Sequence, residues 1–85
     1  MEYKLSKAEA KVLIIASQSP VAENYADFLA VKLNLNSSYV AGMMRRLELA
    51  QKITLLKSGR RTLINNVDKN IIDEAKSLLS EDKKE

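Results

Sequence analysis

The sequence contains no cysteine and no histidine, and only two glycines among its 85 residues. Without cysteine there is no disulfide framework and no thiolate chemistry. Without histidine the commonest metal ligand and general base are both missing. Neither a glycine-rich phosphate loop nor a nucleophile-elbow motif occurs. These absences predict a protein that is not an enzyme and has no catalytic residue, no cofactor and no metal site.

Long hydrophobic runs are also missing. The longest, at 12–16, is far shorter than the about 20 residues that a membrane-spanning helix needs. Charged and apolar residues alternate in the first seven positions, and no small-residue cleavage site follows, so no secretory signal is visible. We therefore expect a cytoplasmic protein with no membrane partner. The length fits one domain, which we place at 1–80, followed by a charged flexible tail at 81–85.

Basic side chains are concentrated in the middle of the chain. Residues 37–65 contain six basic side chains and one acidic side chain, a net charge of +5. Residues 1–36 contain four of each sign, and residues 66–85 contain four basic and six acidic side chains. The positive field therefore belongs to one segment, which indicates a polyanionic partner.

Apolar periodicity predicts two helices in the first part of the chain. Ser6 and Glu9 have the spacing of a capping box, which opens a helix at 7–17. Asn24 is a weaker N-cap for a second helix at 25–33.

A third periodic stretch follows after only three residues, at about 37–50. Asn34 can adopt the left-handed conformation that ends a helix, and Asn36 is a good N-cap for the next one. Two helices joined this tightly must cross at a large angle, so we expect a helix-turn-helix. Met43 and Met44 are expected to fill the core beneath the third helix.

Residues 53–64 change to short apolar and β-branched runs, which predict a β-hairpin. Two registers are open. A turn centred on residues 58 and 59 pairs Leu56 with Arg61, whereas a turn with Gly59 as its first central residue pairs Leu56 with Leu63. We favour the second register, because glycine at that position suits a type II′ turn and apolar side chains then face each other.

A last helix follows the hairpin, with Asn66 or Asp68 as its N-cap. Its apolar side chains repeat at helical spacing and form a wide stripe. We expect this stripe to be the interface of a homodimer; the alternative is that it packs back on the first helix. The stripe consists of Ile71, Ile72, Ala75, Leu78 and Leu79.

The segment around the two central helices resembles a known family. The run L-A-V-K-L-N-L-N-S-S-Y-V at 29–40, continued by M-R-R-L-E at 44–48, is similar to the helix-turn-helix of MarR-type and ArsR-type winged-helix transcription regulators. The resemblance covers about residues 6–66. It implies an α+β, mostly helical fold: a winged helix-turn-helix with a three-helix core, a two-stranded β-hairpin wing and a C-terminal helix.

The same resemblance implies that the third helix lies in the major groove of DNA and that the wing contacts the flanking backbone. Small winged-helix regulators of archaea and their viruses are similar in size. The chain departs from the family pattern at Asn34, where the turn usually has glycine, and at Gln51, near the point where glycine often ends the recognition helix. The wing is also short.

Helical spacing independently predicts which side of the third helix meets DNA. If Val40, Met44 and Leu47 face the core, then Ser38, Gly42 and Arg45 lie on the opposite face, with a flank on either side. The expected DNA-binding residues are Ser37, Ser38, Tyr39, Gly42, Arg45 and Arg46 of this helix and Lys57, Arg60 and Arg61 of the wing.

Each expected contact has a chemical reason. Ser37 and Ser38 lie in the first turn, where backbone amides and hydroxyls can bind a phosphate. Arg45 can donate to both acceptors of guanine, and Gly42 allows a close approach to the groove. Tyr39 either contacts DNA or packs beside the core.

We therefore expect sequence-specific binding of double-stranded DNA, at a palindromic site, by a homodimeric transcription regulator. A winged helix used as a protein-interaction module is one alternative, but it would not require basic groups along both the helix and the wing. A sequence-neutral nucleoid protein is another, and it would carry the same charges with little preference among sequences.

Overall fold

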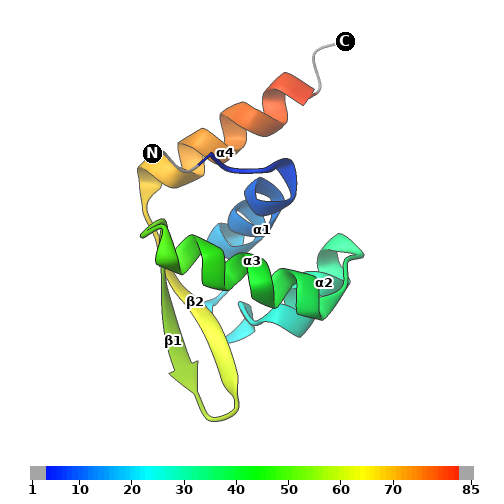
Figure 1. Cartoon of the computed structure of the whole chain (residues 1–85), viewed down its shortest axis with the longest axis vertical. Helices are drawn as coiled ribbons and strands as arrows, with labels where there is room; N and C mark the ends of the chain where they lie inside the picture. The colour runs from blue at the N-terminus through cyan, green and yellow to red at the C-terminus, as the bar shows by residue number, and fades with distance from the viewer. Residues whose placement is uncertain (1–3, 83–85) are drawn as a thin grey trace.

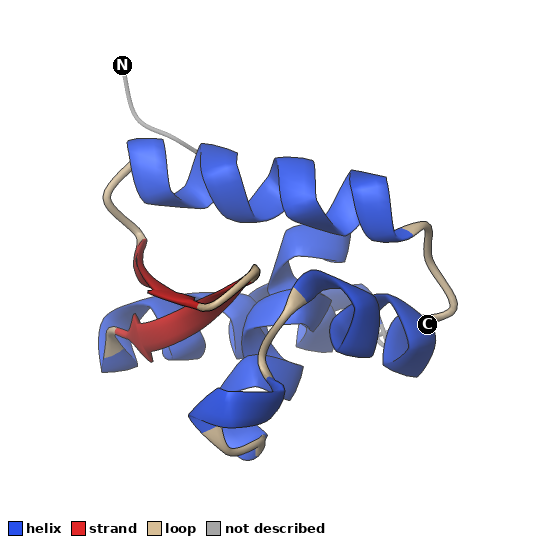
Figure 2. Cartoon of the chain, turned by 90° about the horizontal axis from the view of Figure 1, so that it is seen from below, coloured by secondary structure: helices blue, strands red, loops and turns tan. Residues whose placement is uncertain are grey.

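Four α-helices and one β-hairpin make up residues 4–82, which the computed structural model describes (Figure 1). In chain order the elements are α1 (Lys7–Gln18), the 3-10 helix η1 (Val21–Glu23), α2 (Ala26–Leu33), α3 (Ser37–Leu49), β1 (Ile53–Ser58), β2 (Arg61–Val67) and α4 (Lys69–Asp82). Helices account for most of the molecule (Figure 2). The expected α+β, mostly helical class is therefore confirmed. The hairpin lies at the end of the molecule opposite α4, and α3 crosses between them (Figure 1).

Helix α1 begins at the expected capping box. The Glu9 amide donates to Ser6 Oγ over 3.2 Å, and the Ser6 amide donates to Glu9 Oε1 over 2.9 Å. Each side chain thus satisfies a backbone donor that the first turn leaves without a helical partner. The helix ends one residue later than expected, at Gln18.

The turn between α2 and α3 is stabilised by two asparagines, as expected. Asn34 is left-handed, with φ 57° and ψ 47°. The Leu35 amide donates to the Ala30 carbonyl over 2.8 Å, which gives the bonding pattern of a Schellman motif. Asn36 then caps α3, because its side chain accepts from the amides of two first-turn residues.

A second left-handed residue, Gln51, ends α3. Its φ is 63°. Its amide donates to the Glu48 carbonyl, and the Lys52 amide donates to the Leu47 carbonyl, both over 2.9 Å. This is again a Schellman motif, formed here by a residue type for which the left-handed conformation is costly. Gln51 thus takes the place of the glycine that often ends this helix in the family, and the chain turns there from α3 into the hairpin.

The hairpin has the favoured register. Leu56 pairs with Leu63, and Gly59 has a φ of 63° whereas Arg60 does not have a positive φ, as a type II′ turn requires. Strand β2 is longer than expected because the register shifts near Thr54 and pairing then continues to Val67.

That extension excludes one of the two expected caps of α4. Asn66 pairs with Thr54 inside the hairpin, so it does not cap the helix. Asp68 immediately precedes α4, and its carbonyl accepts hydrogen bonds from the amides of Ile71 and Ile72.

The expected role of Asn24 as a helix cap is wrong. Helix α2 begins after Tyr25, which occupies the N-cap position without a side-chain hydrogen bond. Asn24 is buried instead, and its Nδ2 donates to the Ala16 carbonyl near the end of α1 over 2.9 Å. Its backbone carbonyl accepts from the Ile64 amide of β2, also over 2.9 Å. Asn24 therefore connects α1 to the hairpin.

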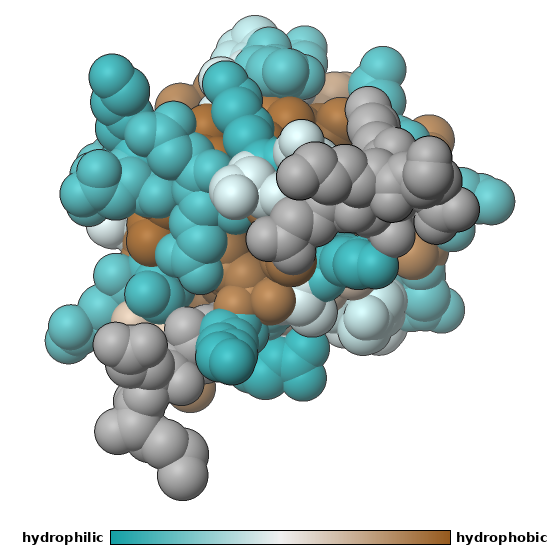
Figure 3. Space-filling model, turned by 90° about the horizontal axis from the view of Figure 1, so that it is seen from above, coloured by the Kyte–Doolittle hydropathy of each residue, from teal (hydrophilic) through white to brown (hydrophobic). Residues whose placement is uncertain are grey.

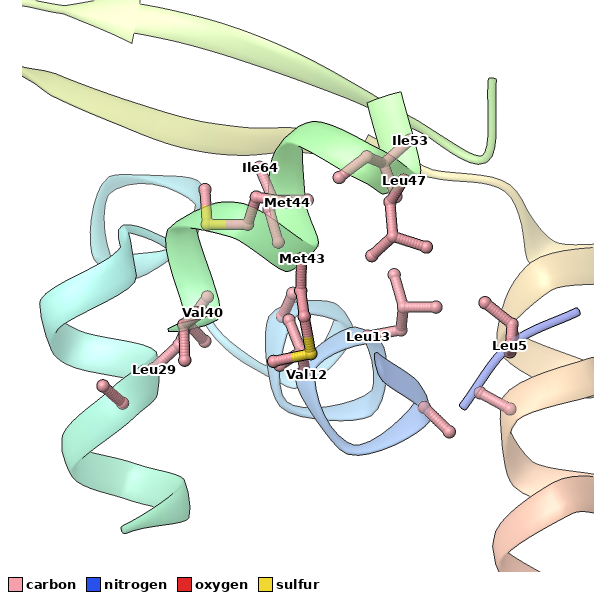
Figure 4. Close-up of a cluster of buried hydrophobic side chains, with 14 residues drawn as sticks. Leu5, Val12, Leu13, Leu29, Val40, Met43, Met44, Leu47, Ile53 and Ile64 are labelled. Atoms are coloured by element: carbon pink, nitrogen blue, oxygen red, sulfur yellow. The ribbon is translucent and has the colours of Figure 1, made fainter. Parts of the chain in front are cut away.

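The core lies between α1, α2, α3 and the base of the hairpin (Figure 4). Met43 points from α3 toward Val12 of α1, and Val40 lies beside Leu29 of α2 (Figure 4). Met43 and Met44 are both buried, so the expectation that they fill the core is confirmed.

Helix α4 packs on α1 of the same chain. Ala75 is fully buried in the common core, and the other four residues of the expected dimer stripe are half-buried and pack against that core. The alternative in which the stripe packs on the first helix is thus what the structure shows. α4 runs to Asp82, so residues 81 and 82 are helical where a flexible tail was expected. The rest of that tail lies outside the described residues.

The left-handed geometry of Gln51 leads to a stability prediction. Gln51→Gly removes the steric cost of a side chain at positive φ and should raise the free energy of unfolding by about 1 kcal/mol. In a domain of this size that corresponds to a rise in Tm of roughly 4–8 °C in a thermal melt. Asn34→Gly is the matched control and should gain less, because asparagine tolerates this conformation. Equal gains at both positions would contradict the argument.

Candidate nucleic-acid interface

The side chains on one side of α3 are buried in the core, and those on the opposite side are exposed to solvent. Val40 and Leu47 are buried, whereas Ser38 and Arg45 are exposed on the face that helical spacing predicts. A Cβ atom built on Gly42 meets nothing within 4 Å. The fold therefore has no steric need for glycine here, and its effect is to keep the centre of this outer face flat.

The outer face continues to the end of α3 with a residue that the sequence analysis did not select. Leu49 is 83% exposed. It follows Arg45 by four residues and Gly42 by seven, so all three lie in one row along the helix. Tyr39, 47% exposed, and the exposed Arg46 lie together on one flank of this row. Tyr39 is thus a surface residue and not part of the core.

The N-terminus of α3 offers fewer free donors than expected. Asn36 Oδ1 accepts from the Ser38 amide at 2.8 Å and from the Tyr39 amide at 3.4 Å. These two first-turn amides therefore already have a partner, which corrects the expectation that the amides of the first turn are free for a phosphate. The groups in this turn that can still donate to a phosphate are the Ser37 amide and the hydroxyls of Ser37 and Ser38.

A groove of about 580 Å³ lies between α3, the start of α2 and the hairpin. Four of the expected DNA-binding side chains line it, and all four are exposed: Arg45, Lys57, Arg60 and Arg61. Helix α3 and the hairpin that follows it thus bring their basic side chains to one concave surface. The other expected residues of α3 do not line this groove, and continue along the helix or lie on its far flank.

The groove also contains two carboxylates, from Asp27 at the start of α2 and Glu48 on α3. Both are exposed. A phosphate inside the groove would be repelled by them, whereas the amino group of a cytosine can donate to a carboxylate. The positive charge is therefore strongest where Arg60 and Lys57 extend from the hairpin, and it is moderated beside Arg45.

Tyr25 lines the same groove and contacts one of its cations. The guanidinium carbon of Arg61 lies 4.1 Å from the centroid of the Tyr25 ring, which is a cation–π contact. A second such contact lies farther along α2, where Lys32 Nζ is 5.5 Å from the centroid of Phe28. The two rings are 6.1 Å apart, centroid to centroid. Arg61 is therefore held against α2 and does not extend freely from the hairpin.

Four residues of this surface were not found from the sequence. Leu49 and Glu48 could have been found, because their spacing from Arg45 places them on the same side of α3. Tyr25 and Asp27 gave no such signal, because they reach the groove only through a tertiary contact, in which the segment before α2 lies along β2.

The other expected interface, on α4, remains partly accessible. Figure 3 views the end of the molecule that carries α4 and shows apolar surface among hydrophilic side chains. Ala75 cannot contact a second chain in this arrangement, because it is 0% exposed. Ile71, Ile72, Leu78 and Leu79 keep part of their surface.

Two further features of residues 4–82 bear on partners. No group of three or more acidic, histidine or cysteine side chains there is arranged to hold a metal ion. None of the helices in this part of the chain is long and apolar enough to cross a membrane.

Comparison with known proteins adds no relative. No protein-family model matches the chain. A search of curated proteins likewise finds no match.

Proposed function

We propose that this chain is a winged helix-turn-helix protein that binds double-stranded DNA sequence-specifically and regulates transcription. α2 and α3 form the helix-turn-helix, α3 is the recognition helix in the major groove, and the hairpin is the wing on the flanking backbone. The observation that carries the proposal is the groove in which Arg45 of α3 meets the basic side chains of the hairpin.

The outer face of α3 supports this assignment. A helix can approach the base edges more closely where its leading face has no bulky side chain. Gly42 provides such a point, with Ser38 before it and Arg45 after it, and no packing requirement of the fold explains a glycine there. Arg45 has the forked donor geometry that matches guanine, and Leu49 can contact a thymine methyl group.

The division of labour within the groove follows from chemistry. Arg45 lies beside Glu48, whose carboxylate repels phosphates but can accept a hydrogen bond from a base. This pair therefore suits base edges, which have both acceptors and donors, better than the phosphate backbone. Arg60 and Lys57 lie on a short wing, which reaches little beyond the DNA backbone. Base reading therefore belongs to α3, and phosphate binding belongs to the hairpin.

The deciding experiment compares Arg45→Ala with Arg60→Ala. After selection of a preferred site from a random duplex pool, fluorescence anisotropy gives affinity for that site and for a random duplex across a salt series. Arg45→Ala should cost about 1–3 kcal/mol on the preferred site and little on random DNA. Arg60→Ala should weaken both equally and reduce the salt slope by about one unit.

For a dimer with about 3–4 phosphate contacts per subunit, log K should fall with log salt at a slope of about −5 to −7. Binding that is insensitive to salt would instead favour a protein-interaction module. Enrichment of no sequence from the pool would favour a nucleoid protein. Equal losses for Arg45→Ala on both duplexes would make Arg45 a phosphate contact.

Gly42→Ala separates folding from binding. Because the added methyl group meets open space, α3 should become more stable by about 0.5–1 kcal/mol through higher helix propensity. The same methyl group stands at the closest point to DNA, so affinity for the preferred site should fall by about fivefold or more, equivalent to about 1 kcal/mol. Chemical denaturation and anisotropy measure the two effects. Ser77→Ala, an exposed change on α4, is the control and should leave affinity unchanged.

We further propose that the regulator is a homodimer that pairs through α4 and binds a palindromic site. Two-fold symmetry would place two copies of α3 about one DNA turn apart. The half-buried apolar side chains of α4 support the proposal, and Figure 3 shows apolar surface at that end of the molecule. Helix α4 lies at the end of the molecule opposite the hairpin (Figure 1), so pairing through α4 leaves the groove open.

Light scattering at micromolar concentration tests the dimer. The wild type should have twice the mass of the chain, and Ile72→Glu and Leu79→Glu should have the mass of a monomer, because each places a charge in the apolar contact. Both side chains also pack against the core of their own chain, so circular dichroism must show that the variants are still folded. Glu74→Lys, on the exposed side of α4, should remain dimeric. A monomeric wild type would rule the dimer out.

A further inference from the structure

We propose that Tyr25 is a positioning residue that holds Arg61 in the orientation needed for a phosphate contact. The proposal rests on the DNA-binding function above and adds a residue to it that is not itself a DNA contact. Its basis is the 4.1 Å separation between the Arg61 guanidinium and the Tyr25 ring, at the border of the groove.

The backbone holds the two partners in register. Tyr25 forms an isolated antiparallel bridge with Leu63, two residues after Arg61 in β2. The carbonyl of the preceding Asn24 accepts from the Ile64 amide over 2.9 Å. Since side chains of a strand alternate between its two faces, Arg61 and Leu63 point to the same side. The short segment before α2 thus runs along β2 and places the ring under the guanidinium.

The ring is the fixed partner of the pair. Tyr25 is half-buried and occupies the N-cap position of α2, whereas Arg61 is exposed. Stacking on a ring face occupies the plane of a guanidinium but leaves its N–H edge free to donate. The arrangement therefore restricts the rotamers of Arg61 without consuming the donors that bind a phosphate.

Restriction of this kind raises affinity, because an immobilised long side chain loses less conformational entropy on binding. Arg60, the neighbouring cation at the turn, has no ring contact among the described residues and must be ordered by DNA itself. The two adjacent arginines should consequently respond differently to the loss of Tyr25, which makes Arg60 an internal control.

A double-mutant cycle on duplex affinity tests the proposal. Tyr25→Leu should weaken binding of the preferred duplex by about two- to fivefold. It should have no further effect in an Arg61→Ala background and its full effect in an Arg60→Ala background. Tyr25→Phe keeps the ring and should bind like the wild type. If Tyr25→Leu weakens binding equally in both backgrounds, Tyr25 contacts DNA itself and the proposal is overturned.

A second measurement needs no DNA. In the NMR spectrum of the free protein, the ring current of Tyr25 should shift the Arg61 side-chain protons, and the shift should persist in Tyr25→Phe and vanish in Tyr25→Leu. The corresponding Arg60 signals should not move. Unchanged Arg61 signals in Tyr25→Leu would overturn the proposal even if duplex binding is found. A wild type that binds no duplex while showing the ring-current shift would instead overturn the proposed function and leave Tyr25 with a structural contact only.

Discussion

The placement of the hairpin relative to the helices depends on one buried residue, Asn24. Its side-chain amide donates to the end of α1 and its backbone carbonyl accepts from β2, so one residue connects the first helix to the hairpin. Because only the N-cap residue Tyr25 separates it from α2, the same residue also constrains where the helix pair begins. The two walls of the groove, α3 on one side and the hairpin on the other, are thus aligned by hydrogen bonds and not by apolar packing alone, which is non-directional.

Helix α3 separates stability from function on its two faces. Its inner residues all enter the core, so substitutions there would affect folding first. Its outer row contains a glycine that packing does not require, an arginine beside a carboxylate, and an apolar side chain almost fully in water. The glycine lowers helix propensity and the exposed leucine buries almost no apolar surface, so neither residue stabilises the monomer. The proposed contact with DNA accounts for all three features, and the mixed charge suits a partner whose surface has both acceptors and donors.

Local signals in the sequence predicted local structure well. The capping box, the left-handed Asn34 and the turn at Gly59 were found because each acts on residues only a few positions away. Asn24 and Tyr25 were misassigned because their partners lie in other elements, and the local preference of asparagine for helix caps points the wrong way. Most residues that line the groove belong to the segment 37–65, in which the charge map found the excess of basic side chains. The charge map could not reveal the acidic contribution of Asp27, which comes from a segment of balanced charge.

The packing of α4 on α1 also has a consequence for the order in which the molecule folds during synthesis. α1 is made first, yet part of its apolar surface is covered only by the last helix, and Ala75 closes the core that α1 begins. A contact between segments this distant in sequence closes a long loop, and the chain loses the corresponding conformational entropy only when α4 docks on α1. Until residues 69–82 have been made and have folded, α1 must therefore expose the apolar side chains that α4 later covers, and exposed apolar surface of this kind favours aggregation of the nascent chain.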